Sequence, residues 1–281
     1  MIRKVFIAGA GTMGLDIARV FAEAGLDVTV RDINQAIITG ARMKLEAGLS
    51  RQVAKGSVEK EEADALRSRI SFTLDMDMAA DADLVLEAIV ERADLKIGVF
   101  QELNRVCGED CIFCTNTSSI SITQLAAASG RPDRFIGMHF FNPATVMKLI
   151  EITRGLTTSD ETFRTVCDLS MEIGKEPVEV QDSPGFVVNR ILVPMMNEAV
   201  FLLQEGTASA EDIDRAMQLG ANHPIGPLHL ADLIGLDVLL QVCDVLYEEM
   251  HDPKYRACWL LRKMVRAGKL GRKTGEGFFR Y

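Results

Sequence analysis

The chain has 281 residues, which corresponds to two domains of ordinary size. With 48% hydrophobic and 25% charged residues, its composition is that of a globular protein and excludes disordered, collagen-like and disulfide-scaffold classes. A formal net charge of −9 argues against nucleic acid or an anionic membrane as the main partner, because both require a surplus of Lys and Arg.

The first part of the chain alternates short β-rich runs with helical patterns, which is typical of an α/β fold with a parallel sheet. Strands are predicted at residues 4–8, 26–30, 70–72, 84–88, 111–114, 135–141, 149–152 and 178–180. Helices are predicted at residues 12–24, 37–66 and 95–106, with two more opened by the capping boxes Ser121–Gln124 and Thr158–Glu161. A polar loop around Gly56 divides the second helix, so that it forms a hairpin standing off the sheet.

The pattern changes after Ser183-Pro184-Gly185, where the strands stop. The remainder predicts only helices, at residues 186–203, 210–219, 230–250 and 256–267. We therefore expect a Rossmann-type dinucleotide-binding domain over residues 1–183 and an all-α domain over residues 184–281. The helix 186–203 is apolar on most sides, which predicts burial in the domain core or against another subunit.

Targeting and metal-binding signals are weak. The apolar run at the start ends at Ala8, and residues 186–203 contain Arg190 and Glu198, so we expect neither a signal peptide nor a membrane span. We therefore expect the protein to be cytoplasmic. The cysteine cluster 107, 111 and 114 has no histidine beside it, so all six cysteines are expected to be reduced core residues, without a metal.

The string Gly9-Ala10-Gly11-Thr12-Met13-Gly14 directly follows a predicted strand and opens a helix. In that position Gly9 can make a tight turn, Gly11 can let a pyrophosphate approach the backbone, and Gly14 can allow close helix–strand packing. Asp32 ends the second strand, where a carboxylate would hydrogen-bond the adenosine ribose. These features predict dinucleotide binding.

Asp32 favours NAD over NADP, because its carboxylate would repel a 2′-phosphate. Arg31 could accommodate that phosphate, but neighbouring side chains in a strand point to opposite faces. We therefore expect NAD as the cofactor, with NADP as the less favoured alternative.

His139 and Glu151 are isolated polar residues in two otherwise apolar predicted strands. A buried carboxylate is costly without a partner, so each residue suggests the other. A carboxylate that accepts from one imidazole nitrogen fixes the tautomer and leaves the second nitrogen to act as a base, which the oxidation of a hydroxyl group requires. A purely structural pair is the alternative.

Several strings together resemble the 3-hydroxyacyl-CoA dehydrogenase family over the entire chain: Gly9–Gly14, Glu87–Glu91, Asn116–Ser119, Gly137–Pro143, Pro184–Arg190 and Lys273–Phe278. The resemblance is greatest to the short bacterial 3-hydroxybutyryl-CoA dehydrogenases, which carry no hydratase domain. It implies hydride transfer between NAD and C3 of a short (S)-3-hydroxyacyl-CoA or 3-oxoacyl-CoA, in a cleft between the domains. A homodimer formed through the helical domain is also expected.

The resemblance implies that His139 is the acid/base, that Glu151 orients it, and that Ser118 and Asn189 hold the substrate. Beside the glycine loop, it implies cofactor contacts at Asp32, Glu91, Lys96, Asn116, Ser118, Asn142 and Lys273. Five of these residues have a structural alternative: a helix cap for Ser118, a buried polar group for Asn189, a solvated helix start for Glu91 and Lys96, and an exposed lysine for Lys273.

Coenzyme A carries phosphates, so an acidic protein needs local cations to bind it. Arg51 and Lys55 lie one helical turn apart on the hairpin, and the resemblance places the CoA moiety there. A second basic run, from Arg262 to Lys273, is expected to be mostly solvated. Two rival functions remain: a CoA-independent hydroxy-acid dehydrogenase, and a crystallin-like nucleotide-binding protein without catalysis.

Overall fold

One eight-stranded sheet organises the first of the two units, Met1–Ser183 and Pro184–Tyr281, into which the chain divides. The computed structural model describes residues 2–281. The strand order is β3-β2-β1-β4-β5-β6-β7-β8. The bounds are β1 Lys4–Ala8, β2 Asp27–Arg31, β3 Ile70–Thr73, β4 Leu84–Glu87, β5 Ile112–Thr115, β6 Phe135–Phe140, β7 Leu149–Arg154 and β8 Glu176–Gln181. Neighbouring strands are parallel apart from β6 and β7, whose pairing is antiparallel.

Helices cover both faces of this sheet. Their bounds are α1 Thr12–Glu23, α2 Gln35–Ala54, α3 Lys60–Arg69, α4 Ala93–Val106, α5 Ile122–Ser129 and α6 Asp160–Glu172. Phe140 of β6 packs edge-on against Phe21 of α1 with ring centroids 6.2 Å apart, whereas Phe135 of the same strand packs against Phe100 of α4 at 4.7 Å. Since residues five apart in a strand point to opposite faces, α1 and α4 lie on opposite sides of the sheet.

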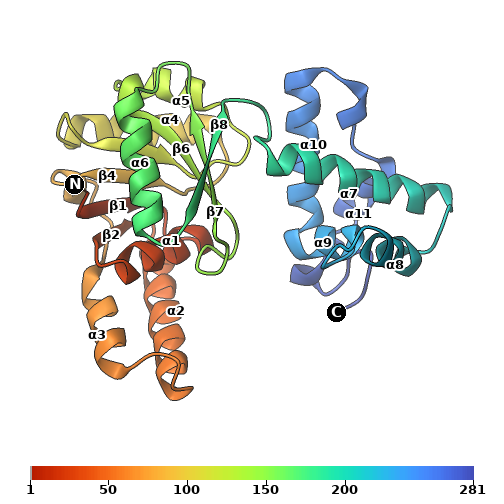
Figure 1. Ribbon diagram of the computed structural model, residues 1–281, viewed down its shortest axis with the longest axis horizontal. Coiled ribbons are helices and arrows are strands. Elements are labelled where there is room, and N and C mark those ends of the chain that lie inside the picture. The colour runs from red at the N-terminus through yellow and green to blue at the C-terminus, as the bar shows by residue number, and fades with distance from the viewer. Residues whose placement is uncertain (1) are drawn as a thin grey trace. The chain divides into compact units, whose positions relative to one another are not determined.

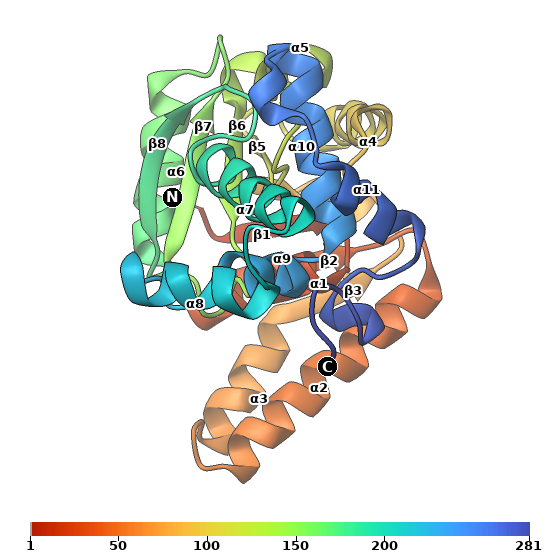
Figure 2. The same cartoon turned by 90° about the vertical axis from the view of Figure 1, so that its right-hand side faces the viewer.

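The predicted α/β class is confirmed, and the first strand has the predicted bounds. The hairpin of α2 and α3 extends away from the sheet, as Figures 1 and 2 show. Two local predictions differ from the structure. The sequence pattern suggested parallel pairing, but β7 reverses direction. The cap of α6 is Ser159, whose hydroxyl accepts from the Thr162 amide, because the Thr158 hydroxyl is already donated to the carbonyl of Phe135.

The second unit is helical: α7 Val188–Glu205, α8 Ala210–Gly220, α9 Pro227–Ile234, α10 Leu236–Met250 and α11 Trp259–Arg266. The helix predicted at 230–250 is wrong, because Gly235 divides it with φ +108°, a backbone angle that an α-helix does not tolerate. The helix predicted from 256 begins at Trp259, since Asn197 of α7 bonds the Arg256 carbonyl at 3.0 Å and the Cys258 amide at 2.8 Å.

The last residues of this unit are tied back to α9. Asp232, which is buried, accepts from the amides of Phe278 and Phe279 at 3.0 and 2.9 Å and from the Tyr281 hydroxyl at 3.2 Å. Three donors therefore satisfy a carboxylate that would be costly to bury alone.

Among residues 2–281, no helix combines the length and apolar character that a membrane span requires. All six cysteines are thiols, and five of them are buried. Within the same residues, no group of His, Cys, Asp or Glu side chains is arranged to hold a metal ion.

The strands β6 and β7 contain one unsatisfied polar atom. Thr153 lies opposite Gly137 and is fully buried, and within the described part of the chain its hydroxyl has no hydrogen-bond partner. Leaving a buried hydroxyl unpaired costs about 1–3 kcal/mol.

We expect Thr153→Val to raise the free energy of unfolding by about 1 kcal/mol, because valine keeps the shape and removes the unpaired hydroxyl. Urea denaturation measures this change. Thr158→Val is the matched control: its buried hydroxyl bonds the Phe135 carbonyl at 2.7 Å, so the same exchange should destabilise the protein. Equal destabilisation by both variants would contradict the expectation.

Candidate active site

The glycine loop between β1 and α1 has the geometry of a phosphate-binding turn. Gly9 has φ +116°, and a Cβ there would lie 2.5 Å from the carbonyl oxygen of Ala88. A Cβ on Gly14 would overlap the Gly9 carbonyl, so this glycine is needed for the contact between helix and loop. A Cβ on Gly11 would meet no atom within 4 Å. The backbone is therefore tightly packed at Gly9 and Gly14 and accessible at Gly11, where a ligand can approach it.

Asp32 lies against this loop. Its carboxylate accepts from the amide of Ala10 at 2.9 Å and from the amide of Ile33 at 2.8 Å. The neighbouring Arg31 turns to the end of β3, where its Nε donates to the carbonyl of Leu74 at 3.3 Å. The carboxylate and the guanidinium thus lie in different surroundings, and only Asp32 borders the glycine loop.

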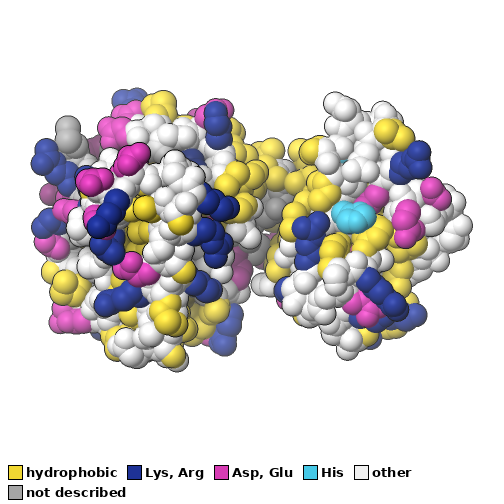
Figure 3. All heavy atoms as spheres, turned by 90° about the horizontal axis from the view of Figure 1, so that it is seen from below, with side chains coloured by type: hydrophobic (Ala, Val, Ile, Leu, Met, Phe, Trp, Pro, Cys, Tyr) yellow, Lys and Arg dark blue, Asp and Glu magenta, His cyan; other side chains and the backbone are white. Residues whose placement is uncertain are grey.

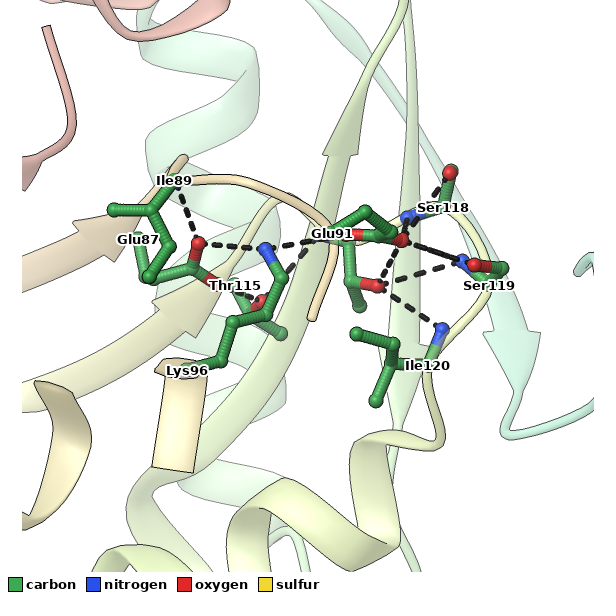
Figure 4. Close-up of polar contacts among 9 residues, drawn as sticks. Glu87, Ile89, Glu91, Lys96, Thr115, Ser118, Ser119 and Ile120 are labelled. Carbon is green, nitrogen blue, oxygen red and sulfur yellow. Dashed lines mark hydrogen bonds and ion pairs between the residues drawn. The ribbon is translucent and has the colours of Figure 1, made fainter. Parts of the chain in front are cut away.

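Buried charges lie at the carboxyl ends of β4 and β5 (Figure 4). The Lys96 ammonium, 1% exposed, contacts Glu87 at 2.6 Å and Glu91 at 3.2 Å. The alternative of a solvated helix start at Lys96 is therefore wrong. Burial raises the pKa of Glu87 above its ordinary value, although Lys96 and the hydroxyl of Thr115 oppose the shift.

Glu91 organises the loop that follows β5. One carboxylate oxygen accepts from the hydroxyl of Thr117 at 2.6 Å and from the amides of Ser118 and Ser119 at 2.9 and 3.1 Å. The hydroxyl of Ser118 lies 3.3 Å from the same oxygen. Burial alone would raise the pKa of Glu91, but Lys96 and these donors outweigh it and hold that pKa below its usual value. Ser118 does not cap α5, because that position belongs to Ser121.

His139 and Glu151 face each other directly across the antiparallel strands. The Nδ1 of His139 lies 2.8 Å from a carboxylate oxygen of Glu151, and the two residues are 6% and 1% exposed. A neutral imidazole that donates from Nδ1 has its basic nitrogen at Nε2. The pairing thus defines which nitrogen of His139 can accept a proton.

The turn between these two strands is held by a buried lysine. The Lys175 ammonium, which is buried, donates to the carbonyls of Ala144 and Met147 at 2.6 and 2.8 Å. Asn142 begins this turn with a cis bond to Pro143. The turn is therefore bound to Lys175, the residue that precedes β8.

Asn116 joins neighbouring strands at the same edge of the sheet. Its backbone amide donates to the backbone carbonyl of Glu87 at 2.8 Å, and its side-chain oxygen accepts from the backbone amide of Phe140 at 2.8 Å. The first unit thus gathers the predicted residues Asp32, Glu91, Lys96, Asn116, Ser118, His139, Asn142 and Glu151 around the sheet and its connecting loops.

The other predicted residues lie elsewhere. Arg51 is in the last turn of α2 and Lys55 caps it, both exposed at the far end of the hairpin. In the helical unit, Asn189 is in the first turn of α7. The Lys273 ammonium bonds both carboxylate oxygens of Asp237, at 2.5 and 2.7 Å.

Two residues of this site were missed in the sequence analysis: Glu87 and Lys175. Glu87 carried a usable signal, because an acidic residue that ends an apolar strand needs a buried partner. Lys175 carried none, since its partners are backbone carbonyls that sequence patterns do not reveal.

The glycine loop, the position of Asp32 and the strand order define a dinucleotide-binding protein. Two family models cover the chain: "3-hydroxyacyl-CoA dehydrogenase, NAD binding domain" matches residues 4–183, and "3-hydroxyacyl-CoA dehydrogenase, C-terminal domain" matches residues 185–281. The chain belongs to the 3-hydroxyacyl-CoA dehydrogenase family, which confirms the resemblance found in its sequence.

Individual relatives match along the whole chain. A 3-hydroxybutyryl-CoA dehydrogenase of Clostridioides difficile is 51% identical over 99% of both chains. One from Bradyrhizobium diazoefficiens is 47% identical over 100% of this chain and 96% of its own. The crystal structure of an (S)-3-hydroxybutyryl-CoA dehydrogenase from Ralstonia eutropha is 50% identical, covers 100% of this chain and 99% of its own, and superposes with a TM-score of 0.96.

We expect Gly11→Ala to leave the melting temperature nearly unchanged and to weaken NADH binding by about tenfold, since the added methyl group occupies only the space left for the ligand. Gly14→Ala should instead lower the melting temperature, because its methyl group overlaps the Gly9 carbonyl. Thermal denaturation and NADH fluorescence titration test both variants. Undiminished NADH affinity in Gly11→Ala would place the pyrophosphate elsewhere.

Proposed function

We propose that the protein is an NAD-dependent dehydrogenase that interconverts (S)-3-hydroxyacyl-CoA and 3-oxoacyl-CoA, with short acyl chains such as 3-hydroxybutyryl preferred. The His139–Glu151 pair carries the proposal, because it supplies an oriented base in the same unit as the glycine loop. The relatives that match over the full chain are named for the 3-hydroxybutyryl-CoA reaction.

The cofactor fits the residues present. The opening at Gly11 admits a pyrophosphate, and Asp32 can accept from the ribose hydroxyls, while Glu91, Lys96, Asn116, Ser118, Asn142 and Lys273 are the further proposed contacts. When bound, NAD supplies the carbon that accepts or returns the hydride. The acidic Asp32 at the loop, with Arg31 turned to Leu74, supports NAD over NADP.

The chain's own part in the reaction is to move a proton and to hold the substrate oxygen. As the C3 hydroxyl is oxidised, Nε2 of His139 takes its proton, and Glu151 stabilises the imidazolium that forms. In reduction, the same nitrogen returns the proton. The Ser118 hydroxyl and the Asn189 amide are the proposed donors to the substrate, aimed where negative charge develops on oxygen.

Oxidation of NADH and NADPH with acetoacetyl-CoA and longer 3-oxoacyl-CoAs tests this function. We expect faster turnover with NADH and with the short substrate. His139→Gln should lower turnover by roughly 10²–10⁴-fold, because the amide can still donate to Glu151 but cannot carry the proton. NADH affinity should be retained.

His223→Gln is the control for loss of a histidine outside the site, and its turnover should match that of the unchanged protein. Near-normal turnover in His139→Gln would remove this residue from proton transfer. No activity with any 3-oxoacyl-CoA would contradict the proposed function itself.

The hairpin of α2 and α3 is the proposed landing site for the CoA phosphates. Arg51 and Lys55 are exposed at its end, within a protein whose net charge is −9. Figure 3 views the molecule from below, on the side to which the hairpin extends, and shows Lys and Arg side chains in several groups among acidic ones. A small local cluster can therefore attract phosphates although the whole protein is acidic.

Reversing both charges with Arg51→Glu and Lys55→Glu should raise KM for acetoacetyl-CoA about tenfold and leave kcat little changed, because only binding away from the reacting carbon is lost. Arg105→Glu with Arg164→Glu is the control, since it makes the same charge change at exposed positions on α4 and α6. An unchanged KM in the hairpin variant would favour the CoA-independent rival.

The helical unit is the proposed dimer interface. Ile191 of α7 is 65% exposed, and Leu219 and Leu233 are also exposed, which is unfavourable unless another surface covers them. A second copy of the chain is the proposed occupant. Analytical ultracentrifugation should give twice the 30.9 kDa mass of the chain, and a monomeric mass at micromolar concentration would contradict the dimer.

A further inference from the structure

The cluster of Glu87, Lys96 and Glu91 holds more negative than positive charge. Lys96 lies 2.6 Å from Glu87 and 3.2 Å from Glu91, and Figure 4 shows its ammonium between the two carboxylates. Among residues 2–281, it is the only cationic side chain that forms an ion pair with either of them. With both carboxylates ionised, one negative charge is left unbalanced.

Hydrogen bonding shows that the ionised form of each carboxylate fits its surroundings. The same oxygen of Glu87 accepts from the Lys96 ammonium at 2.6 Å and from the amide of Ile89 at 2.7 Å, and both groups can only donate. Glu91 accepts from the amides of Ser118 and Ser119. Donors of this kind stabilise both anions: they hold the pKa of Glu91 below its ordinary value, and they oppose the effect of burial on Glu87, whose pKa is still raised.

An unbalanced charge in a buried cluster is unfavourable until a cation comes near. Glu87 itself is 0% exposed, so water does little to screen it. The cluster lies at the carboxyl ends of β4 and β5, whereas the glycine loop follows β1 on the other side of β4. A dinucleotide bound across this edge of a doubly wound sheet has its pyrophosphate at the loop and its second nucleotide on the β4 side.

That second nucleotide carries the nicotinamide, which is cationic when oxidised and neutral when reduced. We propose that Glu87 is a specificity-determining residue that makes the cluster net anionic and so favours the oxidised over the reduced cofactor. This inference rests on the proposed function, because it requires that the dinucleotide be NAD. Glu87 supplies the excess negative charge of the cluster, since Lys96 and Glu91 without it would form a neutral pair.

The test is the ratio of the dissociation constants for NAD⁺ and NADH, measured by isothermal titration calorimetry on the full chain without substrate. In Glu87→Gln we expect NAD⁺ to be weakened relative to NADH by about three- to tenfold. Glu102→Gln is the matched control: it removes the same charge from an exposed position on α4, the helix that carries Lys96, and should leave the ratio unchanged.

A double variant separates charge from structure. Glu87→Gln with Lys96→Met removes the buried pair and leaves Glu91 as the single negative charge, so the ratio should return to within about twofold of the original, whatever its absolute affinities. This variant contains no buried unpaired ammonium, so a changed ratio in it overturns the proposal even if Glu87→Gln does not fold. Support for the proposal comes from the change of ratio in Glu87→Gln.

Three results would overturn the inference: an unchanged ratio in folded Glu87→Gln, an equal loss of affinity for both nucleotides, or a double variant whose ratio departs from the original by more than about twofold. Failure of the unchanged protein to bind either nucleotide would instead contradict the proposed function. The two failures are therefore distinguishable.

Discussion

The antiparallel pairing of β6 with β7 is the constraint on which the candidate active site depends. Directly opposed residues of an antiparallel pair lie close enough for their side chains to meet, and here they are His139 and Glu151. A shift by one residue would send each side chain to the other face of the sheet. The turn that joins the two strands is bound by the buried ammonium of Lys175, which donates to the carbonyls of Ala144 and Met147.

The glycine loop shows which parts of the site a sequence can predict. Gly9 and Gly14 are required by backbone angle and close approach, both of which are local properties, and their roles follow from spacing and from the flanking strand and helix. The pairing of His139 with Glu151 could also be anticipated, because two polar residues in apolar strands need partners.

Other features depend on contacts that only the fold creates. Lys96 lies in the first turn of a helix, which is usually a solvated position, yet Glu87 and Glu91 draw it into the interior. Gly235 has the sequence context of a glycine tolerated within a long apolar helix, but its φ of +108° divides that helix. Ser159 caps α6 because the carbonyl of Phe135, distant in sequence, takes the hydroxyl of Thr158. At Lys96 and Thr158, a long-range partner overrides a local preference.

The attachment of the tail to Asp232 has a consequence for synthesis of the chain. The donors that satisfy this buried carboxylate lie 46, 47 and 49 residues further along the chain. A ribosome that has made α9 has therefore not yet made the groups that allow its carboxylate to be buried. The sheet of the first unit needs nothing beyond residue 181 for its strands, so it can assemble while the tail is still being translated. The order of translation thus places completion of the helical unit last.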